Sequence, residues 1–455
     1  MADEAALHRC VTKFMIDTCQ YSKTEYATFI PFVHLLGRVV MTDVIGDVEW
    51  FVSGSSAEFR IKPTLSCIGD IDIMTVLNEY LVIPHGYTLP TELPRHFESA
   101  VLVFEIIDSH QPGYVYLEPS YVLRKTDNSR YIAKRLINDR GVLFDTCNTV
   151  QTTVQINSHF YNTNMNHEIQ ENTSIQSLLT PSGTPHGPAI NAESNSHFNN
   201  IYTSKHRSLS LSSMDYVPCI RCFPWPPQAI SWPIRYRYHG WPDIPTINMI
   251  VSNGCDVVGA VHPRCKQHEW MSKYQWRLSF SRAEVTLINS WTPVQQIVYH
   301  MLRFVMKRTV LSEDSDPNMP KLSNYHIKTL MLWECEQKPQ SWWSAESSLV
   351  KLCSTLLHKL SGWVNHKNCQ HYFINSCNLV DYFVDDFSSR MISNSLRSLA
   401  DESTLLSWFV ENYVRKCAEC CPTEVALLFQ DIWSSDKLER AAQAVVDWKW
   451  NTQRK

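Results

Sequence analysis

The chain has 455 residues, of which 44% are hydrophobic and 19% are charged, the balance of a globular protein large enough for one bilobal unit or two domains. Its net charge of -4 excludes a protein that is coated in nucleic acid through bulk charge, although one basic face stays compatible with it. No apolar signal core follows the first residues and the apolar stretches are too short to span a bilayer, so we expect a soluble, cytoplasmic protein with reduced cysteines.

Strand patterns dominate the first half of the chain. Apolar residues at helical spacing first predict one or two helices over residues 5–44. Alternating or β-branched apolar runs bounded by turn residues then predict strands. These strands are expected at residues 49–52, 69–77, 101–107, 114–117 and 208–220.

The composition changes twice along the chain. Residues 157–205 are rich in Asn, Ser, Thr, His and Pro, and we expect a disordered insertion there. After residue 282 helical patterns take over. Strands followed by helices predict an α+β, bilobal protein. Its mixed-sheet catalytic lobe would cover residues 1–281 and its helical C-terminal lobe residues 282–455. The best helix candidates are residues 283–310, 325–336, 345–360 and 402–416.

A pair of aspartates gives the first chemical signal. Asp70 and Asp72 are two residues apart in a predicted strand, so both carboxylates project from the same face. Like charges this close are unfavourable unless a cation neutralises them. Mg²⁺, a hard ion that prefers oxygen ligands, is the natural choice, with Mn²⁺ as the alternative. A solvent-facing strand edge would explain the pair equally well.

Two further segments suit the same chemistry. Ser53-Gly54-Ser55 follows a predicted strand, and a glycine there lets the backbone approach a triphosphate, although Gly-Ser pairs mostly mark ordinary turns. Asp215 could complete a two-metal site that activates a hydroxyl and holds the triphosphate. Asp256 competes for this role, but Asp215 is preferred because it lies in mid-strand.

Several motifs occur in one order along the chain. They are Gly54-Ser55-x-Ala57-Glu58, Asp70-x-Asp72-x-Met74, Asp215-x-Val217-Pro218, Trp276-Arg277-Leu278-Ser279-Phe280-Ser281-x-x-Glu284 and Tyr325-His326-x-Lys328. Together they resemble the cyclic GMP-AMP synthase-like receptors, which share the Mab-twenty-one domain and a nucleotidyltransferase fold. Phe59 departs from this pattern, since the family commonly has glycine there.

The resemblance implies roles for individual residues. Asp70, Asp72 and Asp215 would be the catalytic metal ligands, with Mg²⁺ or Mn²⁺ as the cofactor. Gly54 and Ser55 would bind the triphosphate, and Ser53, Arg277 and Ser281 would contact purine edges. Tyr325 would stack on a base and Lys328 or Arg303 would meet phosphate, although Tyr325 and Arg277 could instead pack at the lobe interface. The implied nucleotide-binding residues are Ser53, Gly54, Ser55, Arg277, Ser281, Glu284, Arg303, Tyr325 and Lys328.

The implied function is synthesis of a cyclic dinucleotide from ATP and GTP in innate immunity. Double-stranded RNA is the first expected activator and DNA the second. The stretch from residue 282 to 325 contains no cysteine, so no structural zinc is expected. A non-catalytic developmental or binding protein of the same family remains the alternative, and an RNA-tailing polymerase is a further one. A basic run at residues 124–140 could face nucleic acid, but interleaved acids favour a solvated helix or loop.

Overall fold

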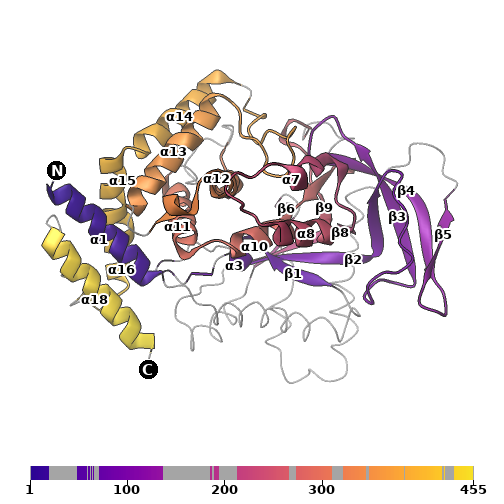
Figure 1. Cartoon of the computed structure of the whole chain (residues 1–455), viewed down its shortest axis with the longest axis horizontal. Helices are drawn as coiled ribbons and strands as arrows, with labels where there is room; N and C mark the ends of the chain where they lie inside the picture. The colour runs from indigo at the N-terminus through magenta and orange to yellow at the C-terminus, as the bar shows by residue number, and fades with distance from the viewer. Residues whose placement is uncertain are drawn as a thin grey trace.

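A mixed sheet and a group of helices occupy opposite ends of the molecule (Figure 1). The computed structural model describes the following residues: 2–19, 49–58, 60–61, 63, 65, 71–136, 185–186, 189–193, 213–265, 273–309, 321–344, 348–383, 385–422, 425 and 435–453. This arrangement confirms the predicted α+β class. In the described part of the chain, no helix is long and apolar enough to cross a membrane.

The sheet is organised around the long strand β2. The first half of β2 pairs with β1 and β8, and its second half pairs with β3. Both β2–β3 and β2–β8 are parallel, whereas the other pairs are antiparallel. The strands are β1 (Trp50–Ser53), β2 (Ile71–Pro84), β3 (Ala100–Asp108), β4 (Tyr114–Lys125), β5 (Tyr131–Arg135), β6 (Pro185–His186), β7 (Ala189–Glu193), β8 (Ser213–Cys222), β9 (Cys255–Gly259) and β10 (Trp276–Ser279).

The helices begin largely at polar capping residues. Asp243, Ser323, Asp385 and Asp401 each accept a backbone N–H from the first turn of the helix that follows. The helices are α1 (Ala2–Thr18), α3 (Gly54–Glu58), α7 (Ser231–Ile234), α8 (Ile244–Asn253), α10 (Ser281–Asn289), α11 (Pro293–Thr309), α12 (Asn324–Gln337), α13 (Leu349–Asn365), α14 (Asp386–Leu399), α15 (Glu402–Phe409), the π-helical turn η4 (Val410–Val414), α16 (Arg415–Glu419) and α18 (Ser435–Gln453).

One hydrophobic core connects the two ends of the molecule. Ile220, Val257 and Trp276 from the sheet belong to the same buried cluster as Leu302 on α11 and Leu356 on α13. Burial of apolar area on this scale is the main stabilising contribution in a domain. The sheet and the helices therefore form a continuous unit, and side chains at their junction have fixed neighbours.

The predicted helix over residues 283–310 is two helices. α10 ends at Asn289 and α11 begins at Pro293. Proline has no backbone N–H and fits the first position of a helix but not its interior. The chain therefore turns between the two helices, and Trp291 in the turn is buried.

The structure differs from the sequence-based expectation in two segments. The first helix was expected with the sheet, and α1 packs against α18, α13 and α15 at the helical end (Figure 1). Its buried residues Val11, Phe14 and Met15 join the shared core. The prediction of disorder over residues 157–205 is wrong for β6 and β7, because β7 hydrogen-bonds along β8; the rest of that segment lies outside the described residues.

Candidate functional site

Two of the three predicted carboxylates lie side by side in the sheet. Asp72 on β2 and Asp215 on β8 are register partners in a parallel pair, so their side chains project from the same face. Neighbouring strands are about 4.8 Å apart. On the other side of Asp72, its register partner is Ser53 at the end of β1. Asp70, the third predicted ligand, lies outside the described residues.

Gly54 lies directly against the Asp72 carboxylate. Its φ of +61° is in the left-handed region, which glycine enters without steric cost. A Cβ atom at this position would lie 1.8 Å from Asp72 Oδ2. No other residue type therefore fits here without displacing the carboxylate. Ser55 follows on α3 and is buried.

These residues suit a hard divalent cation. Two carboxylates on one face supply the oxygen ligands that Mg²⁺ and Mn²⁺ prefer, and the bare Cα of Gly54 leaves the Asp72 carboxylate in place. Within the described residues, no group of three or more His, Cys, Asp or Glu side chains is placed to hold a metal ion. The described part of the predicted site is thus a carboxylate pair rather than a full triad.

Asp256, the competing candidate, has a different environment. It is fully buried on β9, and the guanidinium groups of Arg221 and Arg282 contact its two oxygens at 2.8 and 3.1 Å. Arg282 also donates to Glu49 and stacks over the ring of Phe51. This carboxylate is held by two cations inside the sheet, so its geometry indicates a structural ion pair.

The nucleotide-binding residues predicted on α10 and α12 meet in a buried polar cluster. Tyr325 Oη donates to Glu284 Oε1 at 2.9 Å, and Lys328 Nζ lies 2.8 Å from Glu284 Oε2. Burial raises the pKa of the Tyr325 phenol, and the charge of Glu284 raises it further. Tyr325 is therefore a neutral phenol at physiological pH, with its hydroxyl engaged by protein groups.

The surroundings of Lys328 differ from those of a lysine whose ammonium group is available to bind phosphate. Its ammonium lies between two carboxylates, 2.5 Å from Glu58 Oε1 and 2.8 Å from Glu284 Oε2. Burial disfavours the charged ammonium, but Glu284 and Glu58 outweigh that effect and raise the Lys328 pKa well above its usual value. A charged lysine at this position is thus already neutralised by the protein.

The remaining predicted residues surround this cluster. Arg277 on β10 is exposed and lies near the half-buried Tyr114, whose pKa is raised by desolvation although the charge of Arg277 opposes that shift. Ser281 begins α10 and its hydroxyl lies 3.0 Å from that of Ser279. Arg303 on α11 is buried beside the ring of Tyr299, so it lies within the protein interior.

Sequence reasoning missed Glu58 and His371 as members of the cluster. Glu58 was read only as part of the Gly54-Ser55-x-Ala57-Glu58 motif and His371 was given no site role, yet both are buried and hydrogen-bonded at the junction of sheet and helices. The signal available in the sequence was weak. A glutamate four residues after Gly54 indicates a first helical turn, and only the packing of α3 on α10 reveals its partners.

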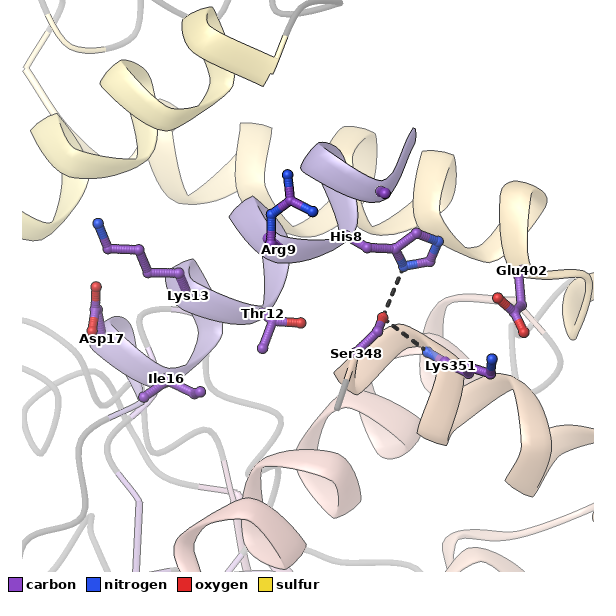
Figure 2. A pocket seen from close by; sticks show the side chains of 10 residues that line it. His8, Arg9, Thr12, Lys13, Ile16, Asp17, Ser348, Lys351 and Glu402 are labelled. Carbon is purple, nitrogen blue, oxygen red and sulfur yellow. Dashed lines mark hydrogen bonds between the residues drawn. The ribbon is translucent and has the colours of Figure 1, made fainter. Parts of the chain in front are cut away.

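Two other features lie apart from this site. Within the predicted basic run, residues 124–136 lie in and beside the β4–β5 hairpin, so the expectation of a helix or loop is wrong there, and the rest of the run lies outside the described residues. Cations on an exposed strand of this kind keep it from pairing with other chains. A cavity of about 560 Å³ lies between α1 and α13 (Figure 2), where His8 Nδ1 contacts the Ser348 hydroxyl. None of the predicted site residues lines this cavity.

The comparisons with known proteins agree with this architecture. Residues 101–290 match the model of the Mab-21 protein nucleotidyltransferase domain, and residues 295–397 match the Mab-21 protein HhH/H2TH-like domain. The protein therefore has a nucleotidyltransferase fold followed by a helical domain, and the chain belongs to the Mab-21 family. Asp215 lies within the first match, whereas Gly54 and Asp72 precede it.

Several curated relatives carry the same family name. The chain is 28% identical over 170 residues to protein mab-21-like 3 of Danio rerio, a match that covers 36% of this chain and 39% of the relative. It is 26% identical over 166 residues to protein mab-21-like of Aedes aegypti, and 24% identical over 163 residues to that of Drosophila melanogaster. These two matches cover 36% and 35% of this chain and 43% and 42% of the relatives, so each match spans about two fifths of the relative's length.

Proposed function

We propose that the protein is a metal-dependent nucleotidyltransferase that makes a cyclic dinucleotide from ATP and GTP. The observation that carries this proposal is the pairing of Asp72 with Asp215 across β2 and β8, with Gly54 packed against Asp72. Two like charges side by side oppose each other's ionisation unless a bound cation or protein groups offset them, and such pairs are typical of functional sites. A family scaffold without catalysis would gain nothing from the pair.

In this proposal each part of the site has its own task. Asp72, Asp215 and the predicted ligand Asp70 would hold Mg²⁺ or Mn²⁺, and a metal ion there would supply activation of a hydroxyl and stabilisation of triphosphate charge. Gly54 would let the backbone lie close to the triphosphate, and the Ser55 hydroxyl would bind its oxygens. The chain itself therefore binds and orients the nucleotide beside the carboxylates.

The base-reading part of the proposal rests on Arg277, Ser281 and Tyr325. An exposed guanidinium and a hydroxyl can read purine edges, and a tyrosine ring can stack on a base. These residues come from β10, α10 and α12, and the Tyr325 hydroxyl on α12 is hydrogen-bonded to Glu284 on α10. The proposed activator is double-stranded RNA, bound through phosphate contacts with strong salt dependence and little sequence preference; duplex DNA is the second candidate.

A product assay tests the proposal. Purified protein is incubated with labelled ATP and GTP, Mg²⁺ or Mn²⁺, and either RNA duplex, DNA duplex or no nucleic acid, and the products are identified by mass spectrometry. The expected result is a metal-dependent cyclic dinucleotide that appears with RNA duplex and declines as salt rises. Linear RNA tails would indicate the polymerase alternative. Absence of any nucleotide product under all conditions would indicate the non-catalytic alternative.

A further inference from the structure

The buried cluster at the junction of sheet and helices contains one cation between two anions. Lys328 on α12 contacts Glu58 at the end of α3 and Glu284 on α10. Glu58 and Glu284 are 1% and 4% exposed, so water screens their charges weakly. Without Lys328, two buried carboxylates would face each other with no counter-ion between them.

A hydrogen-bond chain fixes the direction of Tyr325. His371 Nδ1 accepts the backbone N–H groups of Phe373 and Ile374 at 3.0 and 3.1 Å, so its proton resides on Nε2. That Nε2–H donates to Tyr325 Oη at 2.9 Å, and Tyr325 Oη in turn donates to Glu284. Burial and the nearby charge of Arg277 lower the pKa of His371 to about 3, which keeps this tautomer neutral.

The same cluster reaches the turn beside the carboxylate pair. Glu58 is the last residue of α3, the short helix that begins at Gly54. Besides Lys328, Glu58 accepts a hydrogen bond from the Tyr299 hydroxyl on α11 at 3.1 Å. α3 is therefore anchored at its far end by residues of the helical lobe, while its first residue contacts Asp72.

From these contacts we infer that Lys328 is a positioning residue that bridges Glu58 and Glu284 and so fixes the Gly54–Ser55 turn relative to Tyr325. This inference rests on the proposed function and assigns Lys328 a role other than phosphate binding. Lys328 acts through α3 on the phosphate end of the site and through Glu284 on the base end. A nucleotide must fit both ends at once, and small misplacements of bound groups slow a reaction strongly.

The test compares four forms of the full-length protein in the product assay. Lys328→Met removes the bridge, and Lys328→Met with Glu58→Gln also removes one of the two carboxylates that the bridge neutralises. Lys359→Met is the matched control, since Lys359 also links two helices through a glutamate, Glu334, but lies outside the site. Steady-state kcat, KM for each triphosphate and Tm are measured for each variant and for wild type.

We expect Lys328→Met to lower kcat by about 100-fold, the scale of a misplacement in the site, with little change in KM. The added Glu58→Gln change should restore kcat by about tenfold, because directly contacting charged groups are strongly coupled. Lys359→Met should keep wild-type kcat. If Lys328→Met does not fold, recovery of folded, active protein in the double variant supports the same inference, and its failure to fold overturns it.

A phosphate-binding lysine would give the opposite pattern. KM for the triphosphates would rise with kcat little changed, and the double variant would be no better than Lys328→Met, which would overturn the inference alone. An inactive wild-type protein would overturn the proposed function as well. The two failures are therefore distinguishable from the wild-type measurement.

Discussion

The two ends of strand β8 carry charge in opposite ways. Near its end, Arg221 faces Asp256 on β9 in an opposite-charge pair, whereas near its start Asp215 faces Asp72 on β2, a like-charge pair. In the first arrangement each buried charge is matched, so removing one partner would leave an uncompensated charge in the interior. The second places like charges side by side, which opposes folding, and such arrangements cluster at functional sites. One strand thus separates a structural carboxylate from a candidate catalytic one.

The charged contacts near the end of β8 extend beyond the pair of Arg221 and Asp256. Arg282 joins Asp256 to Glu49, the residue before β1, and its guanidinium packs over the ring of Phe51. Arg221 donates to two backbone carbonyls besides Asp256. The residue before β1, the end of β8 and the start of α10 are therefore linked through Asp256 on β9.

The largest expected effects come from neutralising Asp215, near the start of β8, or Asp256, which faces the end of β8. Asp215→Asn should lower activity by more than about 100-fold, because loss of a ligand exceeds the usual effect of losing its outer partners. Its Tm should stay the same or rise, since the substitution relieves repulsion from Asp72. Product assays and thermal unfolding of the same preparation measure both quantities.

Asp256→Asn should show the reverse. It leaves Arg221 and Arg282 with an incomplete counter-charge in the interior and should lower the free energy of unfolding by about 3 kcal/mol. The fraction that remains folded should keep its activity. An inactive but fully stable Asp256→Asn protein would exchange the roles of the two aspartates.

Two glycines give the next test of the contrast between the candidate catalytic region and the structural one. Gly54 and Gly254 both have positive φ, at +61° and +65°. An alanine Cβ at Gly54 meets the Asp72 carboxylate, which can rotate away, whereas at Gly254 it lies 2.1 Å from the Cys222 carbonyl oxygen and 2.3 Å from that of Phe223. Gly54→Ala should therefore abolish most activity and lower stability by only about 1–2 kcal/mol.

Gly254→Ala should instead act on the fold. Backbone atoms cannot move aside cheaply, so we expect a loss of more than about 3 kcal/mol in denaturant unfolding. Equal effects of the two alanines on stability would show that the Gly54 turn is as rigidly packed as the sheet, and would weaken its assignment to ligand binding.

The smallest expected effect is a pH dependence of stability that comes from Glu49, the partner of Arg282. Burial opposes ionisation of Glu49, but His96 and Arg282 outweigh it and lower the Glu49 pKa from 4.5 to about 2. Because the folded pKa lies below the unfolded one, the stabilisation is present above pH 4.5 and is lost as pH falls toward 2. Tm should drop less between pH 5 and 3 in Glu49→Gln than in wild type. Parallel curves for the two proteins would contradict this assignment.

The sequence predicts the strands of this fold better than its long-range packing. Residue patterns indicate β1, β2, β3, β4 and β8, because alternation is local, and α12 is predicted to within one residue at each end. The position of α1 depends on contacts with α18, more than 400 residues away. Such docking has no local signature, since an amphipathic helix fits many apolar surfaces.

For the candidate site, too, the sequence predicts local features but not the contacts between distant residues. The spacing of Asp70 and Asp72 predicts that they share a face of one strand, but that Asp215 is the register partner of Asp72 follows only from the β2–β8 pairing. Lys328 shows the limit most clearly. A lysine in a family motif suggests phosphate, and only the structure shows that Glu58 and Glu284 already surround it.

Metal binding at the carboxylate pair tests the central claim most directly. Mn²⁺ binding is measured by electron paramagnetic resonance for wild type, Asp215→Asn and Asp256→Asn, each with a non-hydrolysable ATP analogue at a temperature where all three are folded. Activation by a duplex is not required for this measurement. We expect nucleotide-dependent Mn²⁺ binding in wild type and Asp256→Asn, and its loss in Asp215→Asn. Equal binding in wild type and Asp215→Asn, or none in wild type, would contradict the assignment of Asp72 and Asp215 as metal ligands.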